Sequence, residues 1–190
     1  NDCFNSYVYD ENGNLIALLS KDGNNATIDS LDYNSKGQVI RIKTYFDYAG
    51  DIEKGYTYNL VCQGDLVKER ISIRPNGSLS SMYSYSHDER GNMYLSTFFE
   101  FGEKEGEKKN EDQTEYKFDN KNNVFKNVNI KSFFREDGCC YVNNTIEKIY
   151  KSKTLSSVEK FTIEYNEDDY PVKVTGENNY TLYEYKSVEK

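Results

Sequence analysis

A short turn motif recurs along most of the chain, and its spacing leaves few choices for the fold. Each copy starts with an aromatic or aliphatic residue, continues with five mostly polar residues, and ends with an apolar residue. The fourth of the five central residues is usually glycine. The clearest copies are residues 9–15, 33–39, 46–52, 73–79, 87–93 and 118–124, and weaker ones lie at 60–66, 134–140 and 165–171.

These residue types suit a tight reversal of the chain. An Asp or Asn directly after the first residue accepts a hydrogen bond from the backbone two residues on. Glycine adopts φ > 0 without a clash of a Cβ atom. A short loop with one left-handed residue is typical of a hairpin with a G1 bulge, so we expect hairpin turns of this type at the repeat.

The distance between copies determines how the strands run. The turn glycines fall at positions 23, 37, 50, 64, 77 and 91, so the steps are 14, 13, 14, 13 and 14 residues. Each step has room for one strand and one turn. Consecutive strands must therefore run antiparallel, because a parallel neighbour needs a crossover of about a dozen residues.

The expected fold is all-β, a single domain over residues 1–190 with about 13 or 14 strands in one up-and-down meander. A sheet this wide usually curls, splits or closes, so we expect a barrel-like or strongly curved sheet. The charged segment 102–113 lacks apolar periodicity and is predicted to be a mobile loop. Strands are expected at residues 52–60, 66–73, 79–87, 93–101, 123–134, 139–150, 155–165, 171–176 and 180–187, with four more within residues 4–47.

Composition narrows the class of protein. The formal net charge is −8, so no basic surface is expected for nucleic acid or for an anionic membrane. No run approaches the ~18 apolar residues of a membrane helix. The strands have one polar face and one mixed apolar face that must turn inward, which predicts a soluble protein that does not span a membrane. The chain starts at Asn1 without Met. This suggests export, with an N-terminal segment removed that could carry a lipid anchor.

No known catalytic or metal-binding constellation stands out. His87 is the only histidine and takes the aromatic position of the repeat, so a structural role is expected. The acidic turns lack the Gly and Glu spacing of an EF-hand, which argues against calcium. Cys3, Cys62 and the vicinal pair Cys139 and Cys140 have no zinc spacing. They are read as buried thiols, with a disulfide between Cys62 and one of the pair as the alternative.

Tyrosines are the best functional clue. Eighteen are present, and several lie two residues apart in expected strands, so each pair shares a face of the sheet. Amphipathic rings on a rigid sheet suit sugars, peptides or lipid head groups, although rings of this kind also pack as cross-strand ladders. The candidate ligand-binding residues are Tyr56, Tyr58, Tyr83, Tyr85, Tyr183 and Tyr185.

The repeat also carries a resemblance to known families. The aromatic-Asp pattern, clearest at residues 9–15 and 87–93, resembles the YD repeats of the RHS family. A closer resemblance is to secreted bacterial envelope proteins with a domain of unknown function that has a porin-like fold. Their Gly-Tyr-Pro element is similar to Asp169, Tyr170 and Pro171, with Asp in place of Gly. The resemblance implies a curved or closed antiparallel meander, lipoprotein-like export and no known catalytic residue.

We therefore expect a non-catalytic exported binding or interaction module of the bacterial envelope, on its periplasmic or cell-surface side. Its partner would be a glycan, a peptide, a lipid-like ligand or an envelope protein, and no cofactor is expected. The alternative is a purely structural spacer without a small-molecule site. A third and weaker hypothesis is a hydrolase whose carboxylates come from separate strands.

Overall fold

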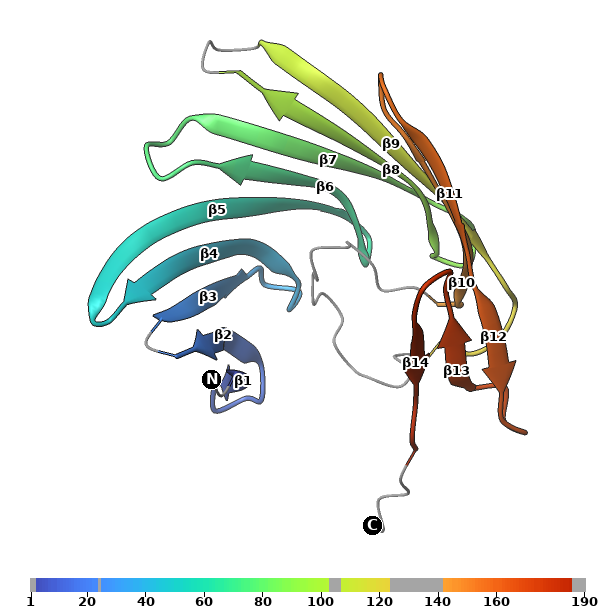
Figure 1. Cartoon of the computed structure of the whole chain (residues 1–190). Coiled ribbons are helices and arrows are strands. Elements are labelled where there is room, and N and C mark those ends of the chain that lie inside the picture. The colour runs from blue at the N-terminus through green and yellow to red at the C-terminus, as the bar shows by residue number, and fades with distance from the viewer. Residues whose placement is uncertain (1–2, 24, 103–106, 124–141, 186–190) are drawn as a thin grey trace. The chain divides into compact units, whose positions relative to one another are not determined.

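The chain folds into strands joined by turns in a computed structural model, which describes residues 3–23, 25–102, 107–123 and 142–185. None of these residues forms a helix long and apolar enough to cross a membrane. Fourteen strands are described (Figure 1). They are β1 Cys3–Tyr9, β2 Leu15–Asp22, β3 Asn25–Tyr33, β4 Val39–Tyr48, β5 Asp51–Gln63, β6 Leu66–Ile73, β7 Leu79–His87, β8 Met93–Phe101, β9 Lys108–Phe118, β10 Thr145–Lys151, β11 Ser156–Lys160, β12 Thr162–Tyr165, β13 Pro171–Thr175 and β14 Tyr180–Leu182.

The strand order confirms the all-β meander. Strands β1 to β11 lie in one sheet in their order along the chain, and β12 to β14 form a second sheet in the same way. Every described register is antiparallel, as the short spacing of the turns requires. In the described residues no pairing joins β1 to β11, so the hydrogen-bonded ladder has two ends.

The chain divides into two compact units, which are described separately. Unit 1 contains Asn1–Ser84 and Phe98–Asn110, and unit 2 contains Tyr85–Thr97 and Glu111–Lys190. Strands β7, β8 and β9 contribute residues to both units. One domain over residues 1–190 stays a prediction.

The best copies of the repeat form the expected turn. In the first copy, Oδ1 of Asp10 accepts hydrogen bonds from the backbone N–H groups of Asn12 (2.9 Å) and Asn14 (2.8 Å). The glycine of this copy has φ 79°, and the strand before the turn has a register shift at its last residue. Equivalent side-chain bonds form at Asn34, Asp88 and Asn166. The predicted combination of an Asx turn, a left-handed residue and a bulge is confirmed at Asp10, Asn34 and Asn166. At Asp88 the Asx turn and the left-handed glycine are confirmed.

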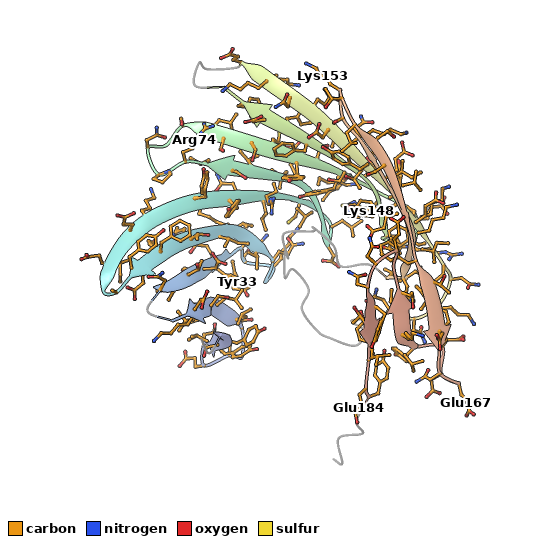
Figure 2. The ribbon with its side chains drawn as sticks, viewed as in Figure 1. Tyr33, Arg74, Lys148, Lys153, Glu167 and Glu184 are labelled. Atoms are coloured by element: carbon orange, nitrogen blue, oxygen red, sulfur yellow. The ribbon has the colours of Figure 1, made fainter. Side chains whose placement is uncertain are left out.

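One copy replaces the Asp with arginine. Arg74 begins the β6–β7 turn (Figure 2), and its guanidinium donates to the backbone oxygen atoms of Leu79 and, at 3.3 Å, Phe101. Asn76 takes over part of the Asx role, because its Oδ1 accepts a hydrogen bond from the backbone N–H of Ser78 (3.0 Å). The turn therefore tolerates a change of its first polar residue when a later side chain supplies the acceptor.

Two copies form shorter hairpins than predicted. Tyr48 pairs directly with Asp51, so only Ala49 and Gly50 form the β4–β5 loop. Both loop residues have φ > 0, at 56° and 104°, as a type I′ turn requires. Residues 64–65 form a similar two-residue loop between β5 and β6. The expected five-residue loops at 46–52 and 60–66 are wrong, because left-handed residues in the loop let the strands pair up to its edge.

Several strand boundaries also differ from the prediction. Segment 102–113 was expected to be a loop, but β9 begins at Lys108, where neighbouring strands supply pairing that the charged sequence alone does not reveal. The expected strand 155–165 is two strands in different sheets, β11 and β12, separated at Phe161. The expected strand 139–150 begins only at Thr145, and β14 stops at Leu182. The expected strand 123–134 lies outside the described residues apart from Asn123, which is not part of a strand, and the copy at 134–140 lies wholly outside them.

Buried residues mark one face of the strands in unit 1. Leu31 of β3 pairs with Ile42 of β4, and Ile42 pairs with Tyr58 of β5, so these side chains share a face. Leu31 is 7 % exposed. On the same face, the buried hydroxyl of Thr44 donates to Oδ1 of Asp29 (2.5 Å). This face thus combines apolar, aromatic and hydrogen-bonded polar side chains.

Candidate functional site

The cross-strand register gathers predicted and unpredicted residues on one face of unit 1. Tyr58 of β5 pairs with Ser72 of β6, and Arg70 of β6 pairs with Tyr83 of β7. Arg70 and Ser72 lie two residues apart and therefore share a face. Tyr56 joins them because it precedes Tyr58 by two residues. We call Tyr56, Tyr58, Arg70, Tyr83 and Phe98 the aromatic face.

The rings of the aromatic face are in contact through arginine. The guanidinium carbon of Arg70 lies 5.3 Å from the ring centroid of Tyr58 and 4.5 Å from that of Tyr83. These distances allow cation–π attraction to both rings. Tyr56 stacks beside Tyr58 with centroids 6.3 Å apart, and Tyr83 packs against Phe98 at 4.9 Å. The result is a continuous row of side chains across β5, β6, β7 and β8.

A bulge in β5 positions the outer end of this row. The register between β4 and β5 shifts between Lys43 and Tyr45, opposite Gly55. A Cβ atom at Gly55 would lie 2.8 Å from the ring of Phe46 and 3.0 Å from the backbone oxygen of Thr44. Only glycine fits so close to the neighbouring ring and backbone. The bulge bends β5, whose curve is visible in Figure 1, and it places Tyr56 next to this point.

Exposure rises toward Tyr56. Its side chain is 37 % exposed, whereas Tyr58, Arg70, Tyr83 and Phe98 are half-buried. The face therefore offers one accessible ring and the edges of several others, with a positive charge held among them. Such an arrangement can stack against a flat apolar surface and donate hydrogen bonds at its rim.

The other three predicted tyrosines belong to unit 2. Tyr85 is 5 % exposed and is part of the core, so its ring is not available on the surface. Tyr183 follows β14, and its backbone N–H donates to the carbonyl of Val172 (3.0 Å). Tyr185 donates its hydroxyl to the carbonyl of Pro171 (2.8 Å). Its ring packs 5.7 Å from that of Tyr170, and burial, followed by the neighbouring tyrosines, raises the pKa of the Tyr185 hydroxyl.

Unit 2 contains a buried cluster of amide side chains that was not predicted. Asn92 is only 1 % exposed, and its Oδ1 accepts hydrogen bonds from the backbone N–H groups of Val142 (3.0 Å) and Asn143 (2.9 Å). Its Nδ2 donates to Oδ2 of Asp88 and to Oδ1 of Asn143, each at 3.0 Å. One amide therefore joins the β7–β8 turn to the segment before β10.

The network continues from that segment to further copies of the repeat. Asn144 donates to Asp119 and to the carbonyl of Asn122 (2.9 Å). Asp119 also accepts a hydrogen bond from the hydroxyl of Tyr165. Burial and then this contact with Asp119 raise the pKa of Tyr165. The only sequence signal for this cluster is the placement of Asn after the turn glycine and the Asn pairs at 122–123 and 143–144.

In the described residues, the carboxyl groups whose pKa is shifted have a lowered pKa, because they accept hydrogen bonds from neighbouring side chains and backbone. The side chain and backbone of Asn14 lower the pKa of Asp10. For Asp88, burial raises the pKa, but hydrogen bonds from Asn92 and the turn backbone outweigh it, so the pKa is lowered. Lys117, at 2.6 Å from Oε1 of Glu147, lowers the pKa of that carboxyl. A general acid at neutral pH would require a shift in the other direction.

The histidine and the cysteines of the described residues do not form a metal-binding cluster. His87 is the last residue of β7, in the aromatic position of its turn. Cys62 is half-buried, burial raises the pKa of its thiol, and it forms no disulfide with another described residue. Cys139 and Cys140, the expected alternative partners, lie outside the described residues. Within those residues, no three His, Cys, Asp or Glu side chains gather as a metal site.

Comparison with known proteins gives a likeness in fold. No protein-family model and no curated protein matches the chain. A crystal structure of a porin-like protein from Bacteroides uniformis is similar, with a TM-score of 0.53 and 12% sequence identity. The match covers 95% of this chain and 91% of that protein. At this identity the likeness concerns the fold alone, and it agrees with the porin-like β-fold that the sequence resemblance implied.

Proposed function

We propose that the protein is a non-catalytic binding module of the bacterial envelope that holds a glycan on its aromatic face. The observation that carries this proposal is the placement of Arg70 against both Tyr58 and Tyr83, with the more exposed Tyr56 stacked beside them. The face is assembled from four strands, so its rings are held by the sheet and need little reordering to meet a ligand.

The chemistry of the face suits a sugar. A pyranose ring has an apolar C–H face and a polar rim of hydroxyl groups. Tyr56 and Tyr58 offer ring faces and hydroxyls that match both parts. Ser72 of β6 pairs with both Tyr58 and Ser81 of β7. Ser72 is buried, whereas Ser81 is half-buried, so Ser81 is the serine that offers a hydroxyl to a ligand here. We therefore favour a carbohydrate over a peptide or lipid head group as the ligand of this face.

The envelope location rests on the fold and the repeat. The similar structure is a porin-like bacterial protein, and the hairpin repeat resembles the YD-type hairpins of secreted envelope proteins. We therefore propose that the protein is exported to the periplasmic or cell-surface side of the envelope. Lipoprotein-like export, which the same resemblance implies, belongs to this proposal.

A structural spacer is the second candidate function. The observation that favours it is the amide cluster of unit 2, in which turns are joined by many buried hydrogen bonds. Such a cluster stabilises the arrangement of the turns and does not itself bind a ligand. A spacer predicts that no saccharide changes the stability of the protein.

The test is a glycan-array and calorimetric binding study of the double variant Tyr56→Ser, Tyr58→Ser. Loss of two ring contacts should weaken binding by about tenfold or more. The matched control is Tyr94→Ser, because Tyr94 of β8 is 46 % exposed and lies outside the aromatic face. Equal binding by the double variant and the wild type would refute the site. An array without any bound glycan, together with unchanged melting temperatures, would favour the spacer.

A further inference from the structure

The 11-stranded sheet ends at β11, whose outer edge borders a hollow within unit 2. Among the strands that the structure describes, β11 pairs only with β10. The hollow has a volume of about 280 Å³. It is lined by Ser157, Val158 and Glu159 of β11 and by Glu177, Asn178 and Asn179 of the β13–β14 turn.

The backbone of β11 presents hydrogen-bonding groups to this hollow. The N–H of Phe161 donates to the carbonyl of Ile146 in β10 (2.9 Å). Backbone groups alternate in direction along an antiparallel strand, so Glu159 and Ser157 also bond toward β10. The N–H and C=O of Val158 then point outward. Val158 lies in the middle of the strand and is 54 % exposed.

The dimensions of the hollow fit a short piece of an added strand. A strand residue occupies about 3.3 Å along the chain, about 4.8 Å between strands and about 10 Å through the sheet, or roughly 160 Å³. The hollow, with a volume of about 280 Å³, therefore leaves room for at least one residue of such a strand. The flanking residues of such a strand would continue along the exposed edge of β11.

The charges around the hollow select the kind of strand. Its two charged lining side chains are both carboxylates, Glu159 of β11 and Glu177 of the β13–β14 turn. The chain as a whole carries a net charge of −8, which disfavours an acidic partner. We propose that the outer edge of β11 binds an extended basic peptide segment, which pairs with the backbone at Val158 and places a Lys or Arg side chain near Glu159 and Glu177. Addition of a strand to an exposed edge is a common mode of peptide recognition. This site is independent of the aromatic face.

The experiment measures binding of short peptides by fluorescence anisotropy. The probe is a labelled Thr-Lys-Val-Lys-Thr peptide, compared with its Glu-containing counterpart and with a version methylated on alternate backbone nitrogen atoms. We expect the basic peptide to bind, the acidic one to bind at least tenfold more weakly, and the methylated one to lose binding because it cannot pair. Failure of the basic peptide to bind, or equal binding by the methylated peptide, would overturn the proposal.

Protein variants separate the backbone contribution from the charge contribution. Val158→Pro removes the outward N–H and fixes φ, and an edge strand tolerates it because this N–H does not bond β10. It should abolish binding, whereas Val158→Thr should retain it. The double variant Glu159→Gln, Glu177→Gln should bind about fivefold more weakly. Glu167→Gln, in the β12–β13 turn (Figure 2), is the charge control and should have no effect.

Unchanged binding by Val158→Pro would refute edge pairing. A concentration-dependent dimer that Val158→Pro abolishes would instead identify a second copy as the occupant and overturn the peptide proposal.

Discussion

Two copies of the turn repeat have nearly the same sequence and very different surroundings. Residues 10–14 and 88–92 differ only at their third position, where Asn12 corresponds to Arg90. Their internal hydrogen bonds are alike, since the final Asn donates its backbone N–H to the first Asp at 2.8 Å in both. The backbone of that Asp donates to the final Asn at 2.9 Å in both.

The difference lies outside the turn. Asn14 is exposed, and among the described residues its side chain bonds within its own loop. Asn92 is buried and also binds the backbone of Val142 and Asn143. The local sequence thus determines the shape of the turn, and the neighbouring segments determine how much stability it contributes. A repeat that looks uniform in the sequence has copies of unequal importance.

The largest expected effect comes from replacing the final Asn of each turn by Ala. Asn92→Ala leaves the buried N–H of Asn143 without its acceptor and removes the amide donor to Oδ2 of Asp88, whose Oδ1 keeps its backbone partners. The variant should lower the free energy of unfolding by about 3 kcal/mol. Asn14→Ala removes an exposed hydrogen bond and should cost less than about 1 kcal/mol. Urea unfolding followed by circular dichroism measures both. Equal losses in the two variants would contradict the comparison.

A smaller effect is expected at the most divergent copy. Asp169 occupies the glycine position of the turn at 166–170 with φ 62°, and its Oδ1 lies 2.5 Å from Nζ of Lys121. Asp169→Gly relieves the left-handed strain but loses an exposed ion pair, so stability should change little. Asp169→Ala loses the pair and keeps the strain, and it should be about 1 kcal/mol less stable than the Gly variant.

Thermal unfolding measures the stability of the two Asp169 variants. Lys121→Gln is the control for loss of the ion pair. If the Ala variant is as stable as the Gly variant, the left-handed backbone at this position carries no cost. The turn at 166–170 would then differ from the glycine-containing turns in its backbone energetics as well as in its side chain.

The smallest effect is a dependence of stability on pH. The folded pKa values of Asp10 and Asp88 lie below the ordinary value of 3.8. The stability that these carboxylates contribute is therefore complete above that value and is lost as the pH falls through the lower folded values. The double variant Asp10→Asn, Asp88→Asn should lose less stability than the wild type between pH 5 and about pH 2. Parallel curves for the two proteins would argue that other groups cause acid unfolding.

Much of the fold could be predicted because the turn residues act locally. The predicted strands 79–87 and 93–101 coincide with β7 and β8, and Pro171 begins β13 beside a register shift, as a residue without an N–H should. Lengths of loops were harder to predict. The two-residue loop at Ala49 and Gly50 depends on how far β4 and β5 keep pairing, which no local pattern records.

The candidate site was also predictable only in part, because it depends on how distant strands pair. Tyr56 and Tyr58 share a face because they lie two residues apart, and this spacing can be read from the sequence. The position of Arg70 against Tyr58 and Tyr83 depends on the registers of β5 with β6 and of β6 with β7. Those registers include bulges, and one shifted residue would turn Arg70 to the other face. The amide cluster around Asn92 likewise depends on segments 50 residues apart in the chain.

The central claim is that the repeated turns form a scaffold and that recognition belongs to the aromatic face. The most direct test is an NMR titration of protein with ¹³C-labelled tyrosine rings against a panel of oligosaccharides, with signals assigned by single Tyr→Phe variants. We expect the ring signals of Tyr56, Tyr58 and Tyr83 to shift together, while those of the exposed Tyr94 and Tyr180 stay in place. Shifts confined to other tyrosines, or no shift with any oligosaccharide, would contradict this claim.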